Sequence, residues 1–171
     1  MKIPSNSGII INNVRSFLIL CLLCMGGSLF ALEGFFAGLS TEINANSPRG
    51  PGISGGITLG LDWHQHGALG LKTAYNPNLF VSGALESLAL VRYYLAPGCM
   101  GPFAQAEAGL IYIFAIDEDY LVFNGGLTTG WRFSFGANGY MEPALRVGYP
   151  FLWGLGVTAG LRFQFKKSPN E

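Results

Sequence analysis

The residues best suited to chemistry in this chain are charged side chains that recur inside segments of alternating polar and apolar residues. The set is Asp62, Lys72, Glu86, Arg92, Glu107, Arg132, Glu142, Arg146 and Arg162. Because alternate residues of a strand share a face, we expect all of them to point to one enclosed side of a sheet. A buried charge is costly unless it is paired. We therefore predict a cross-strand ion-pair network, in which Glu142 and Glu107 bridge Arg132, Arg146 and Arg162.

Such a network is compatible with two roles. The paired charges could fill and fix the interior of a closed barrel, since eight strands leave an interior only just wide enough for side chains. The same residues could instead line a narrow or gated pore. The sequence leaves both interpretations open.

The sequence gives less support for a metal site or a catalytic site. His64 and His66 share strand parity, but two ligands without a third histidine or a cysteine nearby fall short of a metal site. Asp117, Glu118 and Asp119 read as a solvated acidic loop. No nucleophile, base and acid occur at a recognisable spacing, and His64 beside Trp63 is the only loose candidate. We expect no metal, no cofactor and no enzymatic activity.

The segment 157–165 shows most clearly what must position these charges. Val157, Ala159, Leu161, Phe163 and Phe165 alternate with Thr158, Gly160, Arg162 and Gln164. An apolar face opposite a face with a central arginine is typical of a wall between lipid and a polar interior.

The same two-residue alternation predicts eight strands, at about 33–43, 53–64, 67–76, 84–95, 103–114, 123–135, 140–149 and 157–165. In the fourth, Leu88 and Leu90 share parity with Glu86 and Arg92, so we place both leucines inside and Leu85, Ala89, Val91 and Tyr93 outside. Pro143 lacks a ladder donor and predicts a bulge or an unpaired position. An even number of such strands suits a closed barrel, which exposes no backbone edge to lipid.

The composition agrees with strands that have one apolar face. Half of the 171 residues are hydrophobic and only 12% are charged, against about 25% charged in a soluble domain. Beyond the N-terminus no apolar run approaches the ~20 residues of a spanning helix. From residue 32 on, eight basic residues face ten acidic ones without a basic patch, which argues against nucleic acid as a partner.

The first residues read as an export signal. Lys2 and Arg15 supply positive charge, residues 17–25 form a short apolar stretch, and small residues follow. We assign 1–31 to a signal peptide cut between 28 and 31, 32–165 to one barrel domain, and 166–171 to a short polar tail. Cys99 is then the only cysteine of the mature chain and cannot form an internal disulfide; we read it as an ordinary turn residue.

The connections give an orientation. With both termini in the periplasm, the turns at 64–67, 96–102 and 136–139 are periplasmic, and those at 43–52, 76–83, 115–122 and 148–154 face outward. We expect aromatic girdles at the strand ends, formed by Trp63, Tyr75, Tyr93, Tyr94, Tyr112, Phe114, Trp131, Phe135, Tyr140, Tyr149, Phe151 and Trp153. Phe151, Leu152 and Trp153 lie in an outer loop, where we expect contact with the outer leaflet or an apolar site.

The end of the last strand carries a family resemblance. Thr158, Gly160, Phe163 and Phe165 resemble the C-terminal assembly signal of bacterial outer-membrane barrels, although Lys166 to Glu171 follow where the family usually ends. With the export signal and eight strands, the chain resembles a small eight-stranded, OmpA/OmpW-like barrel. The resemblance implies recognition by the barrel-assembly machinery, and, in an OmpW-like version, a lateral opening for small hydrophobic molecules.

The sequence thus predicts an all-β, closed, antiparallel up-and-down barrel in the bacterial outer membrane, surrounded by lipid and monomeric. Its predicted role is non-enzymatic, either structural or a narrow, porin-like passage for small solutes. Two alternatives stay open: a lipid-modifying outer-membrane enzyme and a soluble eight-stranded ligand carrier.

Overall fold

The computed structural model describes residues 32–46, 50–77, 83–114 and 119–165. The strands are β1 (Gly34–Asn46), β2 (Gly50–His64), β3 (Gly67–Asn76), β4 (Ala84–Ala96), β5 (Met100–Ile113), β6 (Tyr120–Phe135), β7 (Gly139–Tyr149) and β8 (Trp153–Gln164). Among the described residues, none forms a helix long and apolar enough to cross a membrane. The predicted signal peptide, its cut site, the polar tail and residues 117–118 lie outside the described part of the chain.

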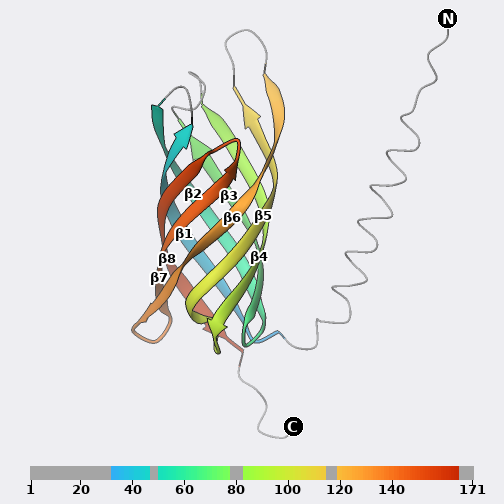
Figure 1. Ribbon diagram of the computed structural model, residues 1–171. Helices are drawn as coiled ribbons and strands as arrows, with labels where there is room; N and C mark the ends of the chain where they lie inside the picture. Colours follow the sequence, from blue (N-terminus) through green and yellow to red (C-terminus); the bar gives the residue numbers. More distant parts are fainter. Residues whose placement is uncertain (1–31, 47–49, 78–82, 115–118, 166–171) are drawn as a thin grey trace, which may run out of the picture. The chain divides into compact units, whose positions relative to one another are not determined.

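The eight strands form one closed barrel (Figure 1). Each strand pairs antiparallel with the next along the chain, and β1 closes the circle by pairing with β8, from Gly34↔Gln164 to Ala45↔Trp153. Both ends of the barrel's chain therefore lie at the end that carries the β2–β3, β4–β5 and β6–β7 turns; we call it the turn end, and the opposite end the loop end. This confirms the predicted fold class and up-and-down order.

Several strands extend beyond their predicted limits at the loop end. β1 and β2 stay paired from Ile43↔Ile53 to Asn46↔Gly50, and β6 begins at Tyr120 rather than near 123. Backbone pairing needs no apolar alternation, so the ladder continues where the sequence pattern stops.

Pro143 interrupts one ladder without shifting it. Pairing of β6 with β7 runs through Gly130↔Ala144 and resumes at Phe133↔Met141 in the same register. Of the two predicted outcomes, the structure shows the unpaired position and not the bulge. On the other side, Pro143 still pairs with Val157 of β8.

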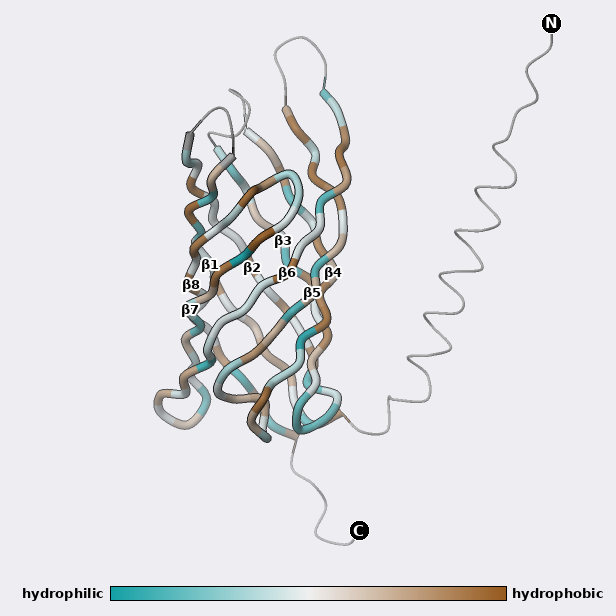
Figure 2. Tube along the Cα trace, in the orientation of Figure 1, coloured by the Kyte–Doolittle hydropathy of each residue, from teal (hydrophilic) through white to brown (hydrophobic). Residues whose placement is uncertain are grey.

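Apolar side chains cover the outside of the barrel, and polar ones fill it. Leu39, Leu71 and Leu127 are 69%, 64% and 63% exposed, whereas Asp62 and Arg132 are 0% and 1% exposed. The hydropathy of the chain alternates along the strands accordingly (Figure 2). A soluble protein has the opposite distribution, and a barrel in lipid has this one. The predicted faces of β4 are confirmed, with Leu88 and Leu90 inside and Leu85, Val91 and Tyr93 outside.

Two apolar clusters fill the ends of the interior. The turn-end plug consists of Phe36, Ala68, Tyr94, Cys99, Phe103 and Tyr140, and the loop-end plug of Ala84, Ile111, Ile113 and Phe151. The expected girdle positions of Tyr94, Tyr140 and Phe151 were therefore wrong, because all three point into the barrel. The expected contact of Phe151 with the leaflet is corrected as well, while Leu152 and Trp153 are exposed.

Glycines on the inner wall make room for the turn-end plug. The Phe36 ring occupies the place that a Cβ on Gly60 would take, and the Tyr140 hydroxyl does the same at Gly38. Any larger residue at these two positions would collide with the plug.

Candidate functional site

The structure buries all nine charged residues that the sequence placed inside, each at 9% exposure or less. It adds Glu42, which is 8% exposed and contacts two of them. The parity of Glu42 with Phe36 and Ser40 carried the signal, but the predicted network omitted it. Among the described residues, the interior therefore holds five acidic and five basic side chains.

The turn-end charges centre on Glu142 of β7. Its Oε1 atom lies 2.5 Å from Arg92 Nη1 and also accepts a hydrogen bond from Arg132 Nε. Arg92 donates further to the Tyr94 hydroxyl at 2.9 Å and to Gln105 Oε1 at 2.6 Å. The Glu142 carboxylate thus pairs with two guanidinium groups.

Aromatic rings of the turn-end plug surround the same two arginines. The Arg132 guanidinium carbon lies 4.4 Å from the Tyr140 ring centre and 4.6 Å from that of Phe36, and Arg92 lies 4.2 Å from Phe103. Within the described residues the two terminal nitrogens of Arg132 have no hydrogen-bond partner. The negative ring faces stabilise this buried cation instead.

Asp62 and Arg162 form a separate pair near the turn end, with 2.6 Å between Arg162 Nε and Asp62 Oδ2. The predicted bridging of Arg162 by Glu142 or Glu107 was therefore wrong. The other two bridges exist: Glu142 with Arg132, and Glu107 with Arg146 at 3.1 Å.

The loop-end charges centre on Arg146 and Lys72. Arg146 lies 3.1 Å from Glu86 and 3.6 Å from Glu42, besides its contact with Glu107. Lys72 Nζ lies 2.9 Å from Glu42 Oε2 and 3.7 Å from Glu86 Oε1. Each cation thus faces more than one carboxylate.

Gln105 joins the two groups of charges into one network. Its carbonyl accepts from Arg92, and its amide donates to Glu107 Oε1 at 2.5 Å, where the Thr128 hydroxyl also donates at 2.8 Å. The charges are unevenly divided. The turn-end group (Asp62, Arg92, Arg132, Glu142, Arg162) has three cations and two anions, whereas the loop-end group (Glu42, Lys72, Glu86, Glu107, Arg146) has two cations and three anions.

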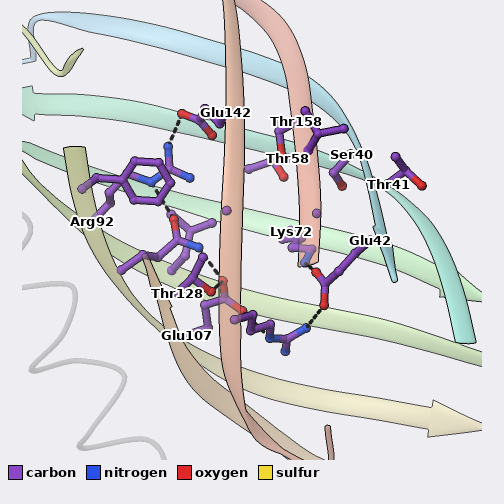
Figure 3. Close-up of a pocket in the computed structure, with 17 residues that line it drawn as sticks. Ser40, Thr41, Glu42, Thr58, Lys72, Arg92, Glu107, Thr128, Glu142 and Thr158 are labelled. Atoms are coloured by element: carbon purple, nitrogen blue, oxygen red, sulfur yellow. Dashed lines mark hydrogen bonds and ion pairs between the residues drawn. The ribbon is translucent and has the colours of Figure 1, made fainter. Parts of the chain in front are cut away.

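A cavity of about 40 Å³ lies between the two groups. Figure 3 shows Lys72 and Glu42 pointing toward each other on one side of it, and Arg92 with Glu142 on another. A water molecule needs roughly 10–15 Å³ measured in this way, so the space holds a few waters. Within the described residues, an apolar plug lies at each end of the barrel interior, on either side of this cavity.

The two histidines lie outside this network, at the turn end. Their rings stack with centres 6.0 Å apart, and the backbone N–H of His66 donates to His64 Nδ1 at 3.3 Å. In the described part of the chain, no group of three or more His, Cys, Asp or Glu side chains is arranged to hold a metal ion.

Comparison with known proteins identifies the fold. No protein-family model and no curated protein sequence matches the chain. Among solved structures, the N-terminal β-barrel domain of Pseudomonas aeruginosa OprF is similar, with a TM-score of 0.56 and 13% sequence identity over 75% of this chain and 97% of that one. Neisserial surface protein A (NspA) is similar with a TM-score of 0.53 and 15% identity over 77% and 96% of the two chains.

The chain has the fold of an eight-stranded outer-membrane β-barrel. This agrees with its apolar outer wall and charged interior. The residues of the resembling C-terminal signal occupy β8 and the residue after it: Phe163 and Phe165 are 45% and 51% exposed on the outside, and Gly160 pairs with Gly38 of β1.

Proposed function

We propose that the protein is a non-enzymatic, structural barrel of the bacterial outer membrane, with its turn end in the periplasm. The observation that carries this proposal is the filled interior. Among the described residues, ten paired charges and two apolar plugs fill the barrel, and the cavity that remains between them is about 40 Å³. Such a barrel anchors its loops in the membrane without passing solutes.

Planar-bilayer recording tests the closed state. Purified protein inserted into a bilayer gives no reproducible conductance step if the structural role is correct. Regular conductance steps of uniform size would contradict the structural role. A heat-dependent shift in gel mobility shows independently that the barrel is folded.

The second candidate is a narrow pore, which the shared ion pairs favour. Lys72 and Arg146 each contact more than one carboxylate, so exchanging partners would not leave a cation unpaired. Conductance that appears only in part of the recordings, and that rises when Arg146 is replaced by Ala, would support the pore.

Insertion into lipid distinguishes both candidates from a soluble carrier. The interior is charged, which does not suit an apolar ligand, and the outside is apolar. We expect the protein to stay with membranes washed in alkaline carbonate; release into the wash would support the carrier.

The enzyme alternative rests on His64, whose Nδ1 atom accepts the His66 backbone N–H and not a serine or carboxylic acid. Incubation with a fluorogenic phospholipid therefore yields no product under the proposed role. Hydrolysis by the wild-type protein that is lost in the His64→Ala variant would support the enzyme in place of the structural role.

We also propose that the barrel-assembly machinery recognises Thr158, Gly160, Phe163 and Phe165. The outward position of both phenylalanines leaves them available to a partner. Replacing both by Ser lowers insertion into membranes that contain the machinery; unchanged insertion would contradict the assignment.

A further inference from the structure

The outer wall of the barrel carries a groove of about 520 Å³ across β4, β5, β6 and β7. Ala104 and Ala106 of β5 form its floor. Its sides and ends are formed by larger side chains, namely Val91 and Tyr93 of β4, Leu127 and Thr129 of β6, and Leu145 and Val147 of β7. The lining exposed on the outer wall is almost entirely apolar.

Strand register explains the shape of the groove. Tyr93 pairs with Ala104 and Val91 with Ala106; the same two rows continue through β6 to Leu145 and Val147. Two alanines in the middle of rows of large residues leave a depression. It starts close to the turn end, since Tyr93 lies near the end of β4, and extends away from that end to Leu127, which lies midway along β6.

A polar ladder of rings continues the groove at the turn end. The His66 ring stacks on Tyr93 with centres 5.7 Å apart, and His64 stacks on His66. His66 Nδ1 lies 2.9 Å from the Tyr94 carbonyl oxygen. Because a carbonyl can only accept, this nitrogen carries the proton.

The hydrogen bonds of His64 leave its Nε2 atom as a donor. Its Nδ1 accepts the His66 N–H, so its proton sits on Nε2, and the side chain is exposed. Within the described ranges, neither histidine has a hydrogen-bond partner at Nε2. A donor to an anionic group is thus held where the apolar groove ends.

We propose that the groove binds one phospholipid of the turn-end leaflet, with an acyl chain along Ala104 and Ala106 and the phosphate at His64. This inference rests on the proposed placement in the membrane. An apolar groove that ends beside the exposed His64 imidazole, which has a donor at Nε2, is complementary to a lipid tail joined to a phosphate. A second copy of the chain suits it less, because two convex barrel walls cannot fill a concave groove.

Native mass spectrometry of the protein purified from membranes tests this site. The protein in nonionic detergent is titrated with phosphatidylglycerol, and separately with diacylglycerol of the same chains. We expect one retained phosphatidylglycerol per protein and weaker retention of diacylglycerol. Ala106→Leu fills the groove and lowers retention of both lipids, by about tenfold if two methylene contacts are lost.

A matched variant outside the groove controls for general effects. Ala159 is exposed on β8 away from the groove, and Ala159→Leu leaves retention unchanged. His64→Phe keeps the ring but removes the donor, so it lowers retention of phosphatidylglycerol to the level of diacylglycerol. Equal retention by wild type and Ala106→Leu would overturn the proposal, as would a dimer that Ala106→Leu dissociates. If the protein did not reside in a membrane, carbonate extraction would release the wild type. Failure of the proposed membrane placement can therefore be distinguished from failure of lipid binding.

Discussion

Asp62 and Arg162 are joined by a 2.6 Å ion pair although 100 residues separate them in the sequence. Asp62 belongs to β2 and Arg162 to β8, and β1 lies between these strands. In the register of β1, Gly34 pairs with Asp62 and Phe36 with Arg162. The small Gly34 lets the two long side chains meet across the strand that closes the barrel.

Removing one member of this pair should destabilise the barrel more than removing both. Asp62→Asn or Arg162→Met leaves one charge buried and unpaired, which costs about 3–5 kcal/mol. In the double variant no charge remains, and most of the free energy of unfolding returns. Urea titration of the protein folded in lipid vesicles measures this difference. A double variant as unstable as the two losses added together would show that the pair does not act as a unit.

The uneven division of charge predicts different costs for two glutamates. Glu142→Gln leaves one carboxylate against three cations at the turn end, so we expect a loss of about 3–5 kcal/mol. Glu42→Gln leaves two carboxylates against two cations at the loop end, and its loss should be less than half of that. Both are measured by the same urea titration. A Glu42→Gln variant as unstable as Glu142→Gln would contradict the assigned balance.

The alternation of side chains predicted the number of strands, their order and the interior position of every charged residue in the set. This succeeds because a strand in a thin wall has only two environments, so parity alone sorts its residues. Partner choice could not be predicted in the same way. Arg162 contacts Asp62 and not Glu142 because the register of the strands brings Asp62 and Arg162 to the same height in the barrel. The alternation of side chains does not determine register, so it could not predict this contact.

The plugs were missed for a related reason. Tyr94 and Tyr140 read as girdle residues because they lie at strand ends, where aromatic residues face headgroups in this class of barrel. Their parity, shared with Arg92 and Glu142, would have placed them inside. Phe151 lies beyond the end of β7, where no alternation exists to indicate its direction.

Phe151 should stabilise the loop end by filling it. The side chain is 1% exposed, packs with Ile111 and Ile113, and lies 5.4 Å from the Arg146 guanidinium. Phe151→Ala leaves a cavity and should cost about 3–5 kcal/mol. Leu152→Ala is the matched control, since Leu152 is 61% exposed and its loss should lie within about 0.5 kcal/mol. Equal losses for the two variants would show that Phe151 is not a plug residue.

Cys99 should be unreactive in the folded protein. Its thiol is fully buried in the β4–β5 turn and donates to the His64 carbonyl oxygen at 3.2 Å. Burial away from water, reinforced by the nearby Asp62 carboxylate, raises the pKa of the Cys99 thiol to about 12. The reactive species is the thiolate, so a maleimide at pH 7.5 should label the folded protein far more slowly than the protein unfolded in urea. Labelling at the same rate in both states would place the thiol at the surface and contradict the turn-end plug.

The raised pKa of Cys99 also has a consequence for stability. Above about pH 9 the unfolded thiol ionises while the folded one stays protonated, so the contribution of Cys99 to stability falls as the pH rises. Cys99→Ser provides the control without a thiol.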